Sequence, residues 1–143
     1  MESTGERLKE RLTRLFEDGA AIAPVVVYLF GSHAAGRPHR ESDVDVGVLL
    51  PWGSYPSARD RFAARVELTS WLEAELRRGP LDVVVLNDAP PHLGRHIVTT
   101  GIRVFCSDPE VAHAYLRDVM LRAADLEPFL RRARRTKLEA LAR

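Results

Sequence analysis

The feature that most constrains the fold is an uninterrupted run of six apolar residues from Val25 to Phe30. The run is short, and it is rich in β-branched and aromatic side chains. Apolar residues that follow one another without alternation over this length are typical of a strand buried on both faces. We therefore predict a central strand here, in a small α/β domain whose helices pack against a short sheet.

Apolar periodicity along the rest of the chain predicts the other elements. Strands are expected over residues 25–30, 43–50, 81–86 and 103–106. Helices are expected over residues 3–18, 58–78 and 91–100, and from residue 108 onward. This order predicts an α/β (α+β) fold with a short mixed sheet flanked by helices. We expect one domain over residues 1–143, with a core over 20–107 and a helical C-terminal segment over 108–143.

Local signals mark several helix ends and one helix face. Ser3 and Glu6 form a capping box, and Gly79-Pro80 is expected to stop the second helix. Pro128 is expected to kink or split the last helix. The second helix is expected to share one apolar face among side chains near four-residue spacing, which are Phe62, Val66, Leu68, Leu72 and Leu76.

Composition sets few limits on function. Hydrophobic residues make up 45% of the chain and charged residues 29%, which are ordinary values for a globular protein. The net charge of +1 argues neither for nor against a nucleic-acid partner. Cys106 is the only cysteine, so no intrachain disulfide can form, and we expect it to be a buried strand residue. Since the polar N-terminus lacks an apolar signal segment, a soluble cytoplasmic protein is expected.

Two acidic features point to metal chemistry. Asp43 and Asp45 lie two residues apart in a predicted strand, which puts both carboxylates on one face with Cβ atoms roughly 6–7 Å apart. Such a pair repels unless a cation lies between, and Mg²⁺ prefers carboxylate oxygens. Taken alone, however, an Asp-x-Asp pair is more often the solvent-facing side of an edge strand. Asp82 is either exposed at a strand end or, if its strand neighbours that of Asp43, a third ligand.

Gly31-Ser32 directly follows the central strand. A glycine there lets the backbone approach a ligand, and the next N–H groups can face an anion, although such a pair alone is usually only a turn. Gly31-Ser32, ten residues, and then Asp43-x-Asp45 together resemble the signature of the DNA polymerase β-like nucleotidyltransferase superfamily. The resemblance is greatest to its minimal nucleotidyltransferase (MNT) branch. Gly36-Arg37, Ser42 before Asp43, and Leu81-Asp82-Val83 agree with it.

The resemblance implies a role for each matching residue. Asp43 and Asp45 would bridge two Mg²⁺ ions, and Asp82 would bind the catalytic ion and help to deprotonate the attacking hydroxyl. The nucleotide-binding residues would be Gly31, Ser32, Arg37 and Ser42. The implied reaction is an in-line displacement at the α-phosphorus of ATP or another NTP, with pyrophosphate leaving. The loop is less basic than in many relatives: His33-Ala34-Ala35 follows Ser32, and only Arg37 and Arg40 supply positive charge. That departure leaves the NTP affinity open.

The resemblance also implies a partner. MNT proteins of this size are commonly encoded beside HEPN-domain proteins, and characterised members act as antitoxins that adenylylate a tyrosine of the HEPN toxin. We therefore expect a HEPN toxin as partner and ATP as donor, with neither membrane nor direct nucleic-acid binding. Two alternatives remain: an antitoxin that only masks its partner and keeps a relic site, and a nucleotidyltransferase of small molecules such as antibiotics. The chain lacks the extra acceptor-holding domain of the latter class.

The remaining motifs give weaker signals. His92 and His96 have a spacing that can bind a metal, but without a third ligand nearby they are better interpreted as helix-surface residues. No phosphate loop of the Gly-x-x-x-x-Gly-Lys type is present. The basic segment over residues 131–137 is either a solvated terminal helix or a docking element for an acidic partner or RNA.

Overall fold

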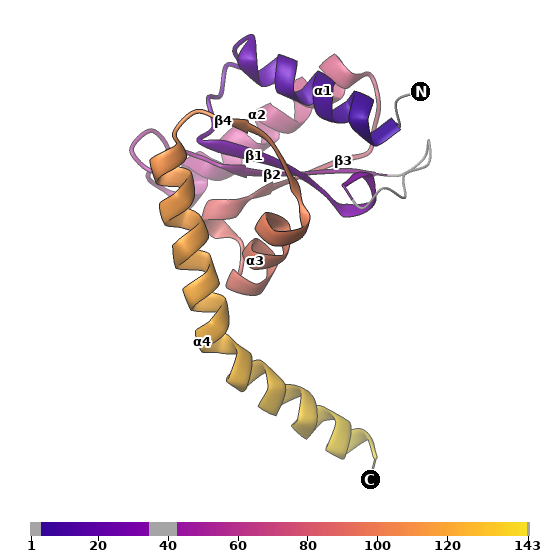
Figure 1. Ribbon diagram of the computed structural model, residues 1–143, viewed down its shortest axis with the longest axis vertical. Coiled ribbons are helices and arrows are strands. Elements are labelled where there is room, and N and C mark those ends of the chain that lie inside the picture. The colour runs from indigo at the N-terminus through magenta and orange to yellow at the C-terminus, as the bar shows by residue number, and fades with distance from the viewer. Residues whose placement is uncertain (1–3, 35–42, 143) are drawn as a thin grey trace.

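The computed structural model describes residues 4–34 and 43–142. The strands are β1 (Val26–Phe30), β2 (Val44–Leu49), β3 (Leu81–Val85) and β4 (Ile102–Cys106). The α-helices are α1 (Thr4–Glu17), α2 (Ala58–Leu76), α3 (Pro91–Thr100) and α4 (Pro109–Leu141). Two short 3₁₀ helices follow strands directly: η1 (Gly31–His33) and η2 (Leu86–Asp88). The predicted order of strands and α-helices is confirmed, and Figure 1 shows their arrangement.

The sheet is mixed, with strand order β3-β2-β1-β4. Strand β1 pairs antiparallel with both β2 and β4, whereas β2 and β3 run parallel. Every residue of β1 is buried, which confirms the central strand predicted from the run of apolar residues. Strand β3 lies at the sheet edge, so one side of its backbone faces no other strand of the described chain.

Helices cover both faces of the sheet (Figure 1). Helices α1 and α2 lie on one face, where Val44, Val46 and Val48 of β2 join their core. Helix α3 and the start of α4 lie on the other face, where Leu49 and Ile97 belong to a second core. The predicted alternation along β2 is confirmed, because its valines share one face of the strand. Across the described residues, no helix combines the length and the apolarity needed to cross a membrane.

The prediction for the apolar face of α2 is wrong at two residues. Phe62 and Val66 are 62% and 52% exposed, respectively. The step from residue 66 to residue 68 breaks the four-residue spacing, so these two side chains lie on a different face from the leucines that follow. The buried face instead consists of Arg61, Ala64, Leu68, Leu72 and Leu76.

Arg61 can be buried because its charge is fully paired. Its guanidinium donates to both carboxylate oxygens of Asp88, at 2.9 Å each, and to the carbonyl of Tyr55. The indole of Trp52 lies 5.0 Å from the guanidinium carbon. The Asp88 hydrogen bonds raise the pKa of Arg61 further above its usual value, although burial opposes this. The pair therefore ties α2 to the end of β3.

Two predictions need correction, and the expected effect of Pro128 takes one of its two forms. Helix α2 ends at Leu76, before Gly79-Pro80, because Arg77 adopts the left-handed conformation that closes a helix. Cys106 is only half-buried, since it ends β4 near the rim of the sheet. Helix α4 is not split at Pro128 but continues through it, and Figure 1 shows that it changes direction along its length. Ser3 of the predicted capping box lies outside the described residues.

Candidate active site

The first part of the site is the junction between β1 and η1. Gly31 has a φ of +78°, a conformation that favours glycine. Across the sheet, Asp45 pairs with Phe30, the residue before Gly31. A Cβ atom on Gly31 would collide with carboxylate oxygen Oδ2 of Asp45 and would lie 3.2 Å from its Cγ. Glycine is thus required at this position both by backbone conformation and by the closeness of the Asp45 carboxylate.

The second part is a pair of carboxylates on neighbouring strands. Asp45 of β2 and Asp82 of β3 are direct partners in the parallel register. Val46 and Val83, the next residues, both belong to the core under α1 and α2, so the two carboxylates lie on the opposite face. Adjacent strands lie about 4.8 Å apart, which brings the two residues side by side. The expectation that Asp82 lies beside the strand of the acidic pair is therefore confirmed.

Asp43 lies at the margin of this pair. The structure begins β2 at Val44, so Asp43 is an exposed residue just before the strand and not inside it as predicted. The Val44 N–H donates to the Pro80 carbonyl, which fixes the residue after Asp43 against the start of β3. The backbone of Asp43 therefore lies next to the start of β3. Within residues 4–34 and 43–142, no three acidic, histidine or cysteine side chains already form a metal-binding group.

The other predicted site residues divide into two groups. Ser32 is described and lies half-buried in η1. Arg37 and Ser42, which were predicted to bind nucleotide, lie outside the described residues, as does Arg40. His92 and His96 are both exposed on α3, as the surface interpretation predicted.

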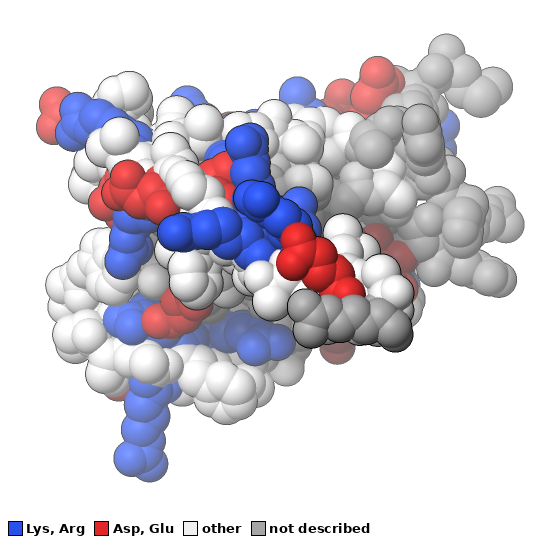
Figure 2. Space-filling model, turned by 90° about the horizontal axis from the view of Figure 1, so that it is seen from below, with Lys and Arg blue, Asp and Glu red and all other residues white. Residues whose placement is uncertain are grey.

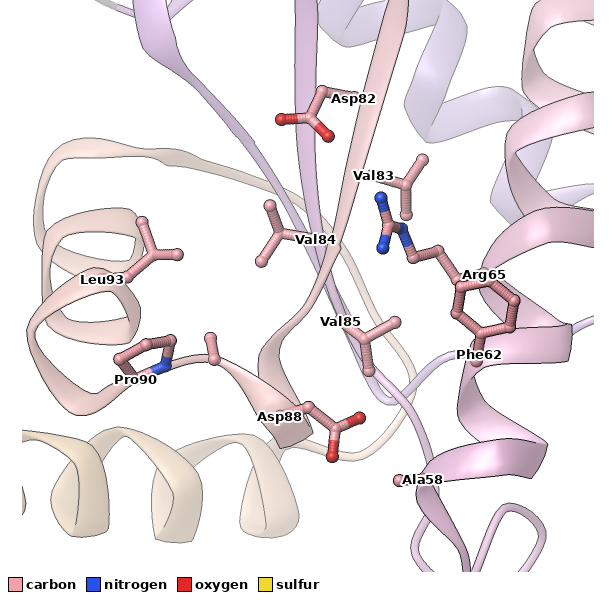
Figure 3. Close-up of a pocket in the computed structure, with 11 residues that line it drawn as sticks. Ala58, Phe62, Arg65, Asp82, Val83, Val84, Val85, Asp88, Pro90 and Leu93 are labelled. Atoms are coloured by element: carbon pink, nitrogen blue, oxygen red, sulfur yellow. The ribbon is translucent and has the colours of Figure 1, made fainter.

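A groove of about 430 Å³ follows the open edge of β3 between α2 and the start of α3. Figure 3 shows Asp82 at one end, Asp88 at the other, and Phe62 and Arg65 reaching in from α2. Leu93 lines the α3 side. The exposed side chain of Phe62 lines this groove. The groove was not predicted, because Phe62 was assigned to the apolar face of α2 together with the leucines that follow it.

Two polar side chains secure the far end of β3. The Asn87 amide accepts from the N–H of Leu50 at 2.8 Å and donates to the Leu50 carbonyl at 2.9 Å. Asn87 thereby joins the chain after β3 to the end of β2, and the Arg61–Asp88 pair joins it to α2. These contacts hold β3 in register beside β2. Sequence reasoning missed both, because an Asn-Asp pair after a strand is indistinguishable from an ordinary turn.

Helix α3 packs closely on the same face of the sheet. A Cβ atom on Gly47, two residues after Asp45, would lie 3.0 Å from Cγ2 of Ile97. Farther out, the Tyr115 hydroxyl of α4 lies 3.5 Å from the Leu86 carbonyl, and its burial raises its pKa to about 12. Helices α3 and α4 therefore form the rigid wall behind the carboxylates.

This chain is similar in sequence to a curated adenylyltransferase. A curated relative, the protein adenylyltransferase MntA of Shewanella oneidensis, is 36% identical over 76 residues. That alignment covers 53% of this chain and 50% of the relative, so the chain matches about half the length of MntA.

Solved structures with the same fold come from toxin–antitoxin complexes. A chain of the MntA–HepT complex superposes with a TM-score of 0.59 at 21% identity, covering 96% of this chain and 99% of that one. A chain of a toxin–antitoxin complex with AMP-PNP gives 0.60 at 21% identity, covering 94% and 98%. The complex of a tri-AMPylated Shewanella oneidensis HEPN toxin with its MNT antitoxin gives 0.56 at 18%, covering 98% and 100%. At these identities the likeness shows the fold alone.

The family described as Polymerase beta, Nucleotidyltransferase matches residues 10–110, which include every candidate site residue named above. The match extends from α1 to the start of α4 and contains the whole sheet. This chain therefore belongs to the polymerase beta nucleotidyltransferase family.

Proposed function

We propose that this chain is a Mg²⁺-dependent nucleotidyltransferase that moves AMP from ATP to an acceptor hydroxyl, a tyrosine of a HEPN toxin partner. It would thus act as an antitoxin. The observation that carries the proposal is the corner of the sheet where Asp45 and Asp82 are register partners and the Asp45 carboxylate packs on Gly31. Both carboxylates lie on the sheet face opposite α1 and α2, and their oxygens are ligands of the kind that Mg²⁺ prefers.

The donor atoms fit Mg²⁺. Carboxylate oxygens are hard ligands, and Mg²⁺ in phosphate-transfer sites takes one or two carboxylates together with substrate oxygens. Asp43, Asp45 and Asp82 would hold the ions. Asp43 and Asp82 are exposed and Asp45 is half-buried, which leaves room for a nucleotide. Bound there, two Mg²⁺ ions would stabilise negative charge on the attacking and leaving oxygens.

The residues of the chain would perform three tasks. The backbone N–H groups of Gly31 and Ser32, at the start of η1, would hold the β- and γ-phosphates. Asp82, which is exposed at the end of the groove, would accept the proton of the acceptor hydroxyl. The acceptor oxygen would then bond to the α-phosphorus as the bond to pyrophosphate breaks. The groove along β3 would admit the acceptor from the open edge of the sheet.

The choice of AMP and of a HEPN partner is supported by the relatives. MntA is named a protein adenylyltransferase, and one structure of similar fold contains AMP-PNP. Another contains an AMPylated HEPN toxin bound to an MNT antitoxin. The full set of acids in this chain favours the same reaction over a masking antitoxin with a relic site.

The test is the mass of the partner. The chain is co-expressed with a candidate HEPN partner, the two are separated under denaturing conditions, and the partner is weighed. We expect mass added in steps of one AMP with the wild-type chain and none with Asp82→Asn. Asp125→Asn, an exposed acid on α4 far from the corner, is the matched control and should modify the partner fully. An unmodified partner that Asp82→Asn still neutralises would identify a masking antitoxin instead.

A further inference from the structure

The second half of α4 extends away from the rest of the molecule (Figure 1). Glu127 is its last tether: the carboxylate accepts from Arg95 of α3 at 3.4 Å, and this contact lowers the pKa of Glu127. Among the described residues after Glu127, none forms a hydrogen bond or ion pair with another element. About four turns of helix are therefore unsupported, and isolated helices of this length are marginal in water.

An apolar seam runs along this unsupported half. In the first half of α4, Ala112, Val119 and Ala123 are buried. Beyond them, Phe129 is 61% exposed and lies with Ala133 and Ala140 in a shallow groove of about 620 Å³. The full set lining that groove is Phe129, Arg132, Ala133, Thr136, Lys137 and Ala140.

The spacing of the seam matches a helix–helix contact. Phe129, Ala133, Thr136 and Ala140 follow one another at intervals of four, three and four residues. That is the repeat by which two helices pack along a shared seam. The two alanines and the threonine are small, so a partner helix can approach closely beside the large Phe129 anchor.

The net positive charge of the same segment favours a negatively charged partner. Residues 128–142 contain five basic side chains and one acidic one, Glu139. Figure 2, which views the molecule from the end of α4, shows the basic side chains gathered there. A second copy of this chain would bring like charges together along the seam, so self-association is disfavoured. RNA would contact the cations but leave Phe129 and Ala133 without an apolar partner.

We propose that the segment over residues 128–142, the docking arm, binds an α-helix of the acceptor protein whose apolar stripe is flanked by carboxylates. The inference rests on the proposed function for the identity of that protein as the HEPN partner. The seam supplies apolar burial, while Arg132 and Lys137 beside it pair with the flanking carboxylates. The arm thereby holds the acceptor protein.

Two substitutions, each of a large apolar residue by glutamate, test the docking arm. Phe129→Glu places a carboxylate on the seam, whereas Leu138→Glu places one off the seam at a side chain that is 66% exposed in the same half of the helix. With full-length chain and the purified HEPN protein, titration calorimetry should show a Kd raised at least about tenfold by Phe129→Glu. Leu138→Glu should change it less than about twofold. Circular dichroism spectra of both variants should match that of the wild-type chain, which checks that the helix is retained.

Three outcomes would overturn the proposal. The first is equal affinity of the two variants for the HEPN protein, and the second is a wild-type dimer in sedimentation equilibrium that Phe129→Glu disrupts. The third is binding of oligouridine that Arg132→Gln abolishes but Phe129→Glu does not. Asp45→Asn separates docking from catalysis, because it should bind the HEPN protein like wild type. If the seam variant loses affinity but the wild-type chain leaves its partner unmodified, only the proposed transfer fails. If transfer proceeds and Phe129→Glu binds normally, only the docking arm fails.

Discussion

The carboxylate of Asp45 packs directly against the α-carbon of Gly31, so the turn after β1 and the acid of β2 share one corner of the sheet. Neither residue can change size without moving the other. The corner thus joins the backbone expected to hold phosphate to a carboxylate expected to hold metal.

Gly31→Ala should abolish nucleotidyl transfer. The methyl group would meet the Asp45 carboxylate at a positive φ, so both the turn and the acid must shift. A misplacement near 1 Å can cost about 100-fold in rate, and we expect at least that loss. The strain should also lower the free energy of unfolding by about 1–3 kcal/mol.

Gly19→Ala provides the matched control. Gly19 also has a positive φ, +100°, but no atom lies within 4 Å of an added Cβ. It should therefore lose about 1 kcal/mol of stability from backbone strain and keep its activity. Equal activities of the two variants in an ATP-transfer assay would show that the Gly31–Asp45 contact has no part in catalysis.

Two substitutions in α2 should differ sharply in cost. Leu68 is 1% exposed and Val66 is 52% exposed, although only one residue separates them. Leu68→Ala should lower the free energy of unfolding by about 2–5 kcal/mol, because it leaves a cavity under the sheet. Val66→Ala should stay within about 0.5 kcal/mol. Urea denaturation measures both, and similar losses would contradict the observed face of α2.

The stability of the wild-type chain should fall between pH 10 and about 12. Burial, together with the nearby Tyr28, raises the pKa of Tyr115 from its usual 10.0 to about 12. A pKa raised by folding gives stability that is fully present below the unfolded pKa and is lost as the pH rises through the folded one. Tyr115→Phe should flatten this loss, which thermal melts at several pH values would show. A slope equal to that of wild type would refute the role of Tyr115.

Much of the fold follows from the sequence. The run before Gly31 is short, uninterrupted and rich in β-branched residues, which favours a strand buried on both faces over a helix. Along β2, Val44, Val46 and Val48 face the core under α1 and α2, while Asp45 between them faces the candidate site. The family motif then pointed to Asp45 and Asp82, whose pairing the parallel register of β2 and β3 confirms.

Other features depend on contacts that no local pattern reveals. Four-residue spacing placed Phe62 and Val66 on the apolar face of α2, but the buried face also includes Arg61, whose partner Asp88 lies 27 residues away in the sequence. Predicting the groove along β3 requires knowing that β3 is an edge strand. The order of strands in a sheet depends on contacts between residues far apart in the sequence. Asp43 was placed inside a strand because strand ends carry little sequence signal.

The position of the transferred phosphorus tests the central claim most directly. The purified chain and the HEPN protein are incubated with Mg²⁺ and ATP labelled either at the α- or at the γ-phosphate, and the proteins are then separated and counted. We predict that the α-label appears on the HEPN protein, that the γ-label leaves as pyrophosphate, and that Asp45→Asn transfers neither. A γ-label on the partner, or an α-label that Asp45→Asn transfers at the wild-type rate, would contradict the account.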